Sequence, residues 1–205
     1  KTTMIQLLAR FYDVTEGEIL VDGCDVNQID SRYLRGAVGI VPQQPQLFSG
    51  SVAKNLRWGR SDASDEELRQ AARIACAEGF VGRMEKGYDT WLEQGGVNLS
   101  GGQKQRLALA RALVTRPKIL ILDDCTSALD AATEAAVLDG LRSMAGSCTT
   151  LLISQRISTV MRTDHILCLD GGRVQGFGTH DELMRDCAAY RAIYDSQIGG
   201  DSHVG

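Results

Sequence analysis

The sequence predicts an α/β fold in which a parallel sheet flanks a helix-rich middle segment. Four short apolar runs have the length and composition of buried strands, at residues 38–41, 119–122, 150–153 and 166–169. The residues between the first two runs show mostly helical spacing. A chain of 205 residues, 43% of them hydrophobic and 23% charged, is long enough to bury the core of one ordinary domain.

Composition argues against several classes of protein. The net charge of -4 offers no basic patch for nucleic acid. No apolar run approaches the roughly 18 residues of a membrane helix, and no signal peptide pattern is visible. The six cysteines are scattered without a CxxC pair, so we expect reduced thiols in a cytosolic protein rather than a zinc site or disulfides.

The first elements are predicted from spacing and turn residues. Apolar residues recur on one face of an N-terminal helix at Ile5, Leu8 and Phe11. A strand entering a turn is predicted at residues 18–23, with glycines at its two ends. The strand at 38–41 is stopped by a proline, and Gln43 follows.

A helical pattern extends from about Gln44 to Leu113. Within it, Ser64 and Glu67 have the spacing of a capping box, which predicts a helix beginning there. The same spacing recurs at Ser100 and Gln103. Two glycines then occupy the first turn of the predicted helix, where they let backbone N–H groups approach a ligand closely. A glycine-rich helix N-terminus is an anion site by geometry and dipole.

The strand at 119–122 ends in two carboxylates, Asp123 and Asp124. Open α/β sheets bind ligands at the carboxyl ends of their strands. An anion site and a site for a hard cation in the same chain indicate a metal-bound phosphate. The remaining elements are predicted, in order, as a helix over 131–144, a strand over 150–154 followed by Gln155, a hairpin around Asp170-Gly171-Gly172, a final helix capped by Thr179 and Glu182, and a flexible tail at 199–205.

The stretch from Leu99 to Asp130 resembles the ATP-binding cassette (ABC) family. It contains an LSGGQ signature, a Walker B strand ILILD and a D-loop ending in Asp130. The resemblance extends over essentially the whole chain. It implies a P-loop NTPase (RecA-like) core with a parallel sheet, an inserted helical subdomain and a C-terminal hairpin and helix.

The resemblance also implies how the chain is divided. Residues 1–43 and 114–198 would form the ATP-binding core, and residues 44–113 the helical subdomain with the Q-loop and signature. The N-terminal strands and most of the Walker A loop would be absent. We therefore expect the isolated fragment, although soluble, to bind ATP poorly, because Lys1 would lack its usual cradle of backbone N–H groups.

Family roles carry over to five residues around ATP and Mg²⁺. Lys1 would reach the β- and γ-phosphates, the Thr2 hydroxyl would ligate Mg²⁺, and Thr3 would touch the α-phosphate. Gln43 would be the Q-loop residue that binds Mg²⁺ or its water. Asp123 would hold Mg²⁺ through water.

Two positions depart from the pattern of active family members. Asp124 stands where they have a glutamate that polarises the attacking water, and Gln155 stands where they have the switch histidine. An aspartate carboxylate falls short by roughly 1.5 Å, and displacements of about 1 Å are already costly. Glutamine cannot carry positive charge. We expect slow hydrolysis at this chain's own site, with conservative drift at both positions as the alternative.

The signature, by contrast, is intact. In the family, the signature of one subunit encloses ATP held by the Walker motifs of the other. Ser100, Gly101, Gly102 and Gln103 would therefore complete the ATP site of a partner. This asymmetry resembles the degenerate subunit of a heterodimeric exporter.

The implied partners are a second nucleotide-binding domain and a transmembrane domain, at the cytoplasmic face of a membrane. The residues around Gln43 resemble the exporter type of Q-loop. Two other functions remain open at this point. One is a non-transport ABC protein of the chromosome-maintenance or repair class, and the other is a non-catalytic regulatory nucleotide binder. Neither the transported substrate nor the partner's identity follows from the sequence.

Overall fold

The computed structural model describes residues 1–198, which form two compact units. The larger unit runs from Thr2 to Leu151. The smaller unit contains Lys1 and the segment from Leu152 onward. The predicted tail at 199–205 lies outside the described residues.

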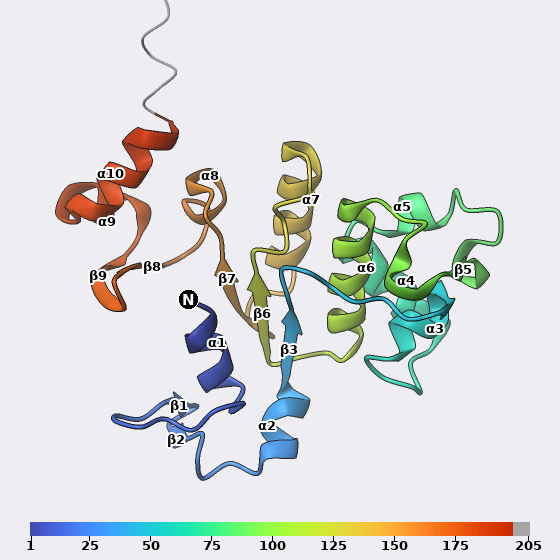
Figure 1. Cartoon of the computed structure of the whole chain (residues 1–205), viewed down its shortest axis with the longest axis horizontal. Helices are drawn as coiled ribbons and strands as arrows, with labels where there is room; N and C mark the ends of the chain where they lie inside the picture. The colour runs from blue at the N-terminus through green and yellow to red at the C-terminus, as the bar shows by residue number, and fades with distance from the viewer. Residues whose placement is uncertain (199–205) are drawn as a thin grey trace, which may run out of the picture. The chain divides into compact units, whose positions relative to one another are not determined.

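The predicted helices and strands occur in the order expected (Figure 1), and several short elements that the sequence did not indicate lie between them. The helices and strands of the larger unit are α1 (Thr2–Leu8), β1 (Leu20–Val21), β2 (Cys24–Asp25), α2 (Ser31–Ala37), β3 (Val38–Val41), β4 (Gly50–Ser51), α3 (Val52–Arg57), α4 (Asp65–Ile74), α5 (Glu78–Val81), η1 (Gly87–Asp89), β5 (Trp91–Leu92), η2 (Gln94–Gly96), α6 (Gly101–Val114), β6 (Ile119–Asp123) and α7 (Ala131–Arg142). Strand β7 (Thr149–Ile153) begins in the larger unit and ends in the smaller. The smaller unit continues with α8 (Ile157–Val160), β8 (Ile166–Asp170), β9 (Arg173–Gly178), α9 (His180–Asp186) and α10 (Ala188–Gln197).

The central sheet has the strand order β3-β6-β7. Strands β3 and β6 are parallel, in a register that pairs Val38 with Ile119 and Val41 with Leu122. The three middle residues of β6, from Leu120 to Leu122, are fully buried, as expected of a parallel strand covered on both faces. The predicted α/β class and its parallel sheet are confirmed.

The helix-rich middle of the chain gathers around α3, α4 and α6, at the right of Figure 1. Its core is aliphatic, and Leu56, Leu68 and Leu107 are almost fully buried there. Helix α4 begins at the predicted capping box, in which the Ser64 N–H donates to Glu67 Oε2 over 2.7 Å and the Glu67 N–H donates to Ser64 Oγ over 3.3 Å. The sequence therefore located the start of α4 correctly.

Four predictions of element ends were wrong, one of them the final helix capped by Thr179 and Glu182, which ends at Asp186 and is followed by α10. The first helix ends at Leu8 because Arg10 takes a left-handed backbone with φ +52°, and Phe11 is left 55% exposed. The strand predicted at 18–23 is shorter, Leu20–Val21, and after the predicted turn it pairs with the antiparallel strand β2, which the sequence did not indicate. Helix α7 stops at Arg142, two residues early.

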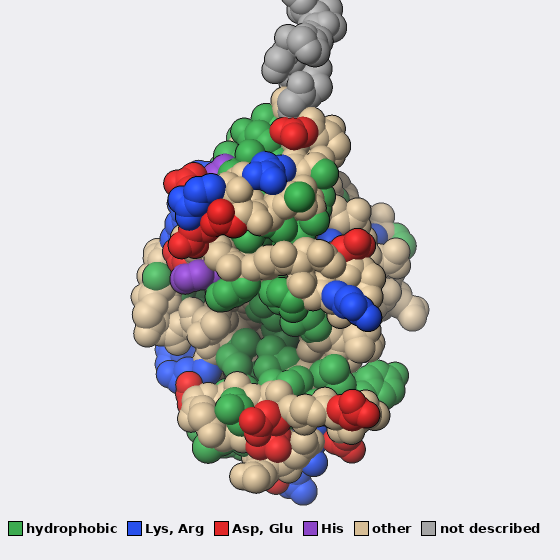
Figure 2. Space-filling view, turned by 90° about the vertical axis from the view of Figure 1, so that its left-hand side faces the viewer, with side chains coloured by type: hydrophobic (Ala, Val, Ile, Leu, Met, Phe, Trp, Pro, Cys, Tyr) green, Lys and Arg blue, Asp and Glu red, His purple; other side chains and the backbone are tan. Residues whose placement is uncertain are grey.

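In the smaller unit, β8 and β9 form the predicted antiparallel hairpin, with Ile166 opposite Gly178 and Asp170 opposite Arg173. One face of the hairpin packs with α9 and α10 in a small core of its own, which contains Cys168, Leu183 and Tyr190. Other apolar side chains of this unit, such as Phe177, are exposed. Figure 2 views the molecule from the left-hand side of Figure 1 and shows hydrophobic side chains among acidic and basic ones.

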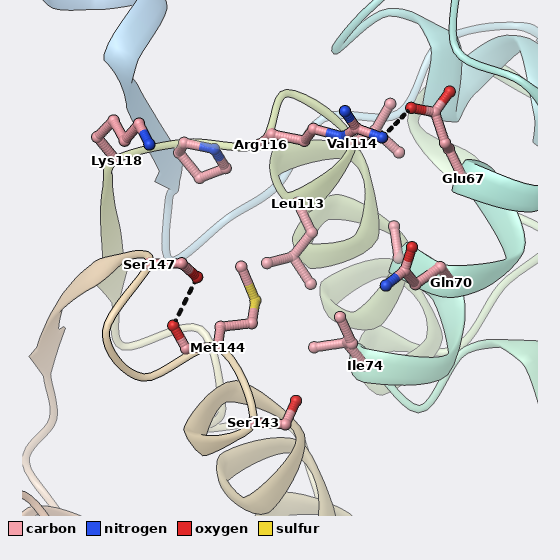
Figure 3. Close-up of a pocket in the computed structure, with 12 residues that line it drawn as sticks. Glu67, Gln70, Ile74, Leu113, Val114, Arg116, Lys118, Ser143, Met144 and Ser147 are labelled. Atoms are coloured by element: carbon pink, nitrogen blue, oxygen red, sulfur yellow. Dashed lines mark hydrogen bonds and ion pairs between the residues drawn. The ribbon is translucent and has the colours of Figure 1, made fainter.

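A cavity of about 390 Å³ lies in the larger unit between α4, the end of α6 and the end of α7 (Figure 3). Its wall is apolar at Ile74, Leu113 and Met144, and its rim carries Glu67 and Arg116. Glu67 forms ion pairs with Arg60 and, at 2.5 Å, with Arg116. The Ser64 N–H and then the Arg60 guanidinium lower the pKa of Glu67 to about 2.

The pKa of Glu67 predicts a pH-dependent contribution to stability. A carboxyl whose folded pKa is depressed stabilises the fold above its unfolded pKa of 4.5, and this stabilisation is lost as pH falls through its folded pKa of about 2. We expect Glu67→Gln to lower the melting temperature at pH 7, because glutamine keeps the cap but loses the ion pairs.

Thermal denaturation at several pH values measures this effect. The difference between wild type and Glu67→Gln should shrink as the pH falls from 4.5 toward 2. Glu85→Gln, which changes an exposed carboxylate without a described ion pair, is the control. A deficit of Glu67→Gln that stays constant over this pH range would contradict the assignment.

Candidate functional site

The signature segment forms the N-terminus of α6 as predicted. Ser100 is the N-cap residue, and its Oγ accepts from the Gln103 N–H over 3.2 Å. In return, the Ser100 N–H donates to Gln103 Oε1 over 2.9 Å. Both side chains are thus engaged in starting the helix, and the N–H groups of its first turn remain directed along the helix axis toward its N-terminus.

The two signature glycines lie against the D-loop of the same chain. A Cβ atom on Gly102 would stand 3.0 Å from the backbone oxygen of Ala128, and one on Gly101 would stand 3.4 Å from Ala128 Cβ. The sequence explained these glycines by the approach of a ligand. The structure adds a second reason, which is the close packing of α6 on residues 127–129.

The carboxylates at the end of β6 are half-buried. Asp123 is the last residue of the strand, and Asp124 follows with a left-handed backbone at φ +49°. This conformation costs an L-residue roughly 1–2 kcal/mol, and aspartate is among the types that tolerate it best. Nothing in the sequence indicated this turn, which sets the direction of the Asp124 side chain.

Gln43 and Asp124 meet at the carboxyl edge of the sheet. The Gln43 Nε2 group donates to Asp124 Oδ2 over 3.1 Å. The register explains the contact, because Val41 pairs with Leu122 and each of the two residues lies two positions further along its chain. The structure therefore brings together two residues that are 81 positions apart in the sequence.

This edge has the donor set that Mg²⁺ prefers. The Gln43 amide nitrogen is turned toward Asp124, so its Oε1 atom and the carboxylates of Asp123 and Asp124 are oxygen donors. Within residues 1–198, no group of three or more His, Cys, Asp or Glu side chains could hold a metal ion. A cation here would depend on one or two carboxylates together with water and ligand oxygens, as Mg²⁺ on phosphates does.

The D-loop leads from β6 into α7. Asp130 is the N-cap residue of α7, accepting at Oδ1 from the Thr133 N–H and at Oδ2 from the Thr133 hydroxyl, each over 2.8 Å. These bonds, the backbone one first, lower the pKa of Asp130. The sequence analysis singled out Asp130 for the D-loop and missed its role as a helix cap.

The sequence analysis also missed Gln105. This side chain is only 5% exposed and bonds to the D-loop at Ser127 and Ala128. A glutamine one turn after a helix start is too common to be noticed in a sequence. Its place on the helical face that continues with the apolar residues Ala108, Leu109 and Ala112 was the one available signal.

The other predicted site residues are exposed. Thr2 and Thr3 lie in the first turn of α1 in the larger unit. Lys1 and Gln155 belong to the smaller unit. Gln155 follows β7, and its backbone oxygen accepts from Gln197 Nε2 over 2.8 Å, which ties it to α10.

The helical part of the larger unit carries exposed aromatic residues. The rings of Phe48 and Trp58 are stacked, with centroids 4.5 Å apart, and Trp58 is 60% exposed. The buried Asn55 side chain holds the Phe48 backbone by accepting from its N–H and donating to its oxygen. Among the described residues, no helix has both the length and the hydropathy needed to cross a bilayer.

Comparison with known proteins identifies this architecture. A family model described as "ABC transporter" matches residues 1–127. The ABC transporter ATP-binding protein YfiB of Bacillus subtilis (strain 168) is 46% identical over 199 residues, which are 97% of this chain and 34% of the relative. ABC transporter B family member 4 of Dictyostelium discoideum is 42% identical over 198 residues, covering 97% of this chain and 26% of the relative. The chain thus spans about a third or less of the length of these relatives.

A solved structure gives the same answer for the fold. The bacterial Atm1-family ABC exporter with ATP bound superimposes with a TM-score of 0.93 at 43% identity, over 97% of this chain and 35% of that one. The match to the family model includes strands β3 and β6 and the signature helix, and the superposition extends over 97% of the chain. The chain belongs to the ABC transporter family and has the fold of an exporter-type nucleotide-binding domain.

Proposed function

We propose that this chain binds ATP with Mg²⁺ and hydrolyses it to power export through a transmembrane domain. The observation that carries the proposal is the contact of Gln43 with Asp124, beside Asp123, at the carboxyl edge of two parallel strands. In this proposal Asp123 and Gln43 hold Mg²⁺, with Thr2 as a further ligand. Lys1 and Thr3 contact the phosphates. When bound, Mg²⁺ neutralises charge on the phosphates.

We also propose that this site turns over slowly. Asp124 would orient the attacking water, but its short side chain is already bonded to Gln43 Nε2. Gln155, at the position of the switch histidine, donates hydrogen bonds without adding positive charge. Each feature leaves the transition state less well stabilised.

The signature then serves a partner. Ser100 and the glycine-rich first turn of α6 would face the γ-phosphate of ATP bound by a second nucleotide-binding domain, with the helix dipole favouring its charge. A homodimer would contain two weak sites, so the proposal favours a heterodimer. Support for this pairing is the intact capping box of α6 beside an altered catalytic position.

The helical part of the chain is proposed to make the contact with the transmembrane domain. In this proposal residues 44–113 form the helical subdomain, and residues 1–43 and 114–198 form the ATP-binding core. The stacked rings of Phe48 and Trp58 and the ring of Trp91 are exposed in the subdomain, and the proposal assigns them to contact with the transmembrane domain. The chain would then act at the cytoplasmic face of a membrane.

Restoring the two altered residues tests the slow site. Asp124→Glu together with Gln155→His should raise hydrolysis at this chain's own site in the assembled transporter. Base catalysis is worth roughly 10²–10⁴-fold, so even partial recovery is measurable once the partner's site is disabled. ATPase rates that do not rise in this background would show that another defect silences the site.

The heterodimer proposal predicts that substitutions in the signature are more harmful than a substitution at Asp124. Ser100→Arg or Gly101→Asp should nearly abolish the steady-state ATPase activity of the assembled pair, because bulk or negative charge enters an anion site. Asp124→Asn should lower it only modestly. If Asp124→Asn is as harmful as Gly101→Asp, Asp124 is a working catalytic residue and a homodimer is favoured.

A further inference from the structure

Gln105 is a buried polar residue in the middle of the signature helix. It is 5% exposed, and Ala108 and Leu109, one turn further along the same face of the helix, are buried apolar residues. A buried amide is costly unless both its donor and its acceptor are satisfied. The hydrogen-bond partners of Gln105 therefore determine whether this side chain stabilises or destabilises the fold.

Both ends of the Gln105 amide bond to the D-loop. Its Nε2 group donates to Ser127 Oγ over 3.4 Å, and its Oε1 atom accepts from the Ala128 N–H over 3.2 Å. Ser127 Oγ in turn donates to the backbone oxygen of Asp124 over 2.9 Å. A continuous chain of hydrogen bonds thus runs from the signature helix through the D-loop to the residue after the Walker B strand.

The packing of the same segments supports this connection independently. Gly102, one turn before Gln105, brings the first turn of α6 so close to the D-loop that an added Cβ would stand 3.0 Å from the Ala128 oxygen. The Asp124 backbone at the other end of the chain is left-handed. Its carbonyl oxygen accepts from the Ser127 hydroxyl over 2.9 Å and from the Ser127 N–H over 3.4 Å, so the hydroxyl supplies the shorter of the two bonds that hold it.

We propose that Gln105 is a positioning residue, which fixes the D-loop against the signature helix so that both present one rigid surface to the partner's ATP. The inference rests on the proposed function, in which α6 encloses that ATP. A purely structural role would affect folding stability alone. A positioning role affects turnover, because a misplacement of about 1 Å can cost on the order of 10²-fold in rate.

Three variants of the assembled transporter test the proposal. Gln105→Met keeps the length of the side chain and removes both bonds. Ser127→Ala removes the shared hydroxyl at an exposed position, so it should fold even where a change at Gln105 does not. Gln105→Glu keeps an acceptor for the Ala128 N–H but loses the donor to Ser127. Gln70→Met makes the same change as the first variant at an exposed position of α4 and is the control.

We expect Gln105→Met to lower the kcat for ATP by roughly 10–100-fold, with KM within about twofold, because geometry rather than binding is lost. Ser127→Ala should lower kcat in the same direction. The double variant should be no worse than the more harmful single variant, because both act through one chain of bonds. Effects of the two changes that multiply, or an unchanged kcat in both, would overturn the proposal.

Amide hydrogen exchange of the transporter supplies a readout that does not depend on activity. The Ala128 N–H should exchange at least tenfold faster in Gln105→Met, stay protected in Gln105→Glu, and be unaffected in Gln70→Met. Unchanged protection in Gln105→Met would overturn the link. If the wild-type assembly does not hydrolyse ATP, the proposed function fails, and exchange at Ala128 still decides whether Gln105 holds the D-loop.

Discussion

The parallel pairing of β3 with β6 is the constraint on which the rest of the site depends. Its register places Val41 beside Leu122, and the segments that follow the two strands leave the sheet at the same edge. Gln43 and Asp124 consequently meet although each belongs to a different connection. A shift of one residue would turn every side chain of β6 to the opposite face, so the buried residues of β6 also protect the geometry of the site.

The signature helix depends on the same strand through the D-loop. Gly102 allows the loop to lie against α6, Gln105 bonds to it, and Asp130 begins the next helix at its end. The N-terminus of α6 and the carboxylate edge of β6 are therefore parts of one packed assembly within the larger unit. We expect a substitution in one of these segments to alter the geometry of the other.

The sequence was sufficient for the elements whose signals are local. The capping boxes at Ser64 and Ser100 marked two helix starts, and the apolar run before Asp123 marked a buried strand. It was not sufficient where the backbone conformation of a single residue determines where an element ends or how the chain turns. Arg10 ends α1 early and Asp124 turns left-handed; arginine gives no sign of this, and aspartate tolerates the conformation without requiring it. The bonds of Gln105 to the D-loop join segments 22 or more positions apart, so no local pattern could show them.

The central claim is that the edge formed by Gln43, Asp123 and Asp124 holds Mg²⁺ with ATP. The most direct measurement is the affinity of the assembled protein for a fluorescent ATP analogue, with Mg²⁺ and with EDTA, in wild type and in Asp123→Asn. The partner's Walker B aspartate is changed to asparagine throughout, so that the Mg²⁺ response comes from this chain. The account predicts that Mg²⁺ tightens binding to the wild-type chain and that Asp123→Asn removes most of this gain. An equal gain from Mg²⁺ in both proteins would contradict it.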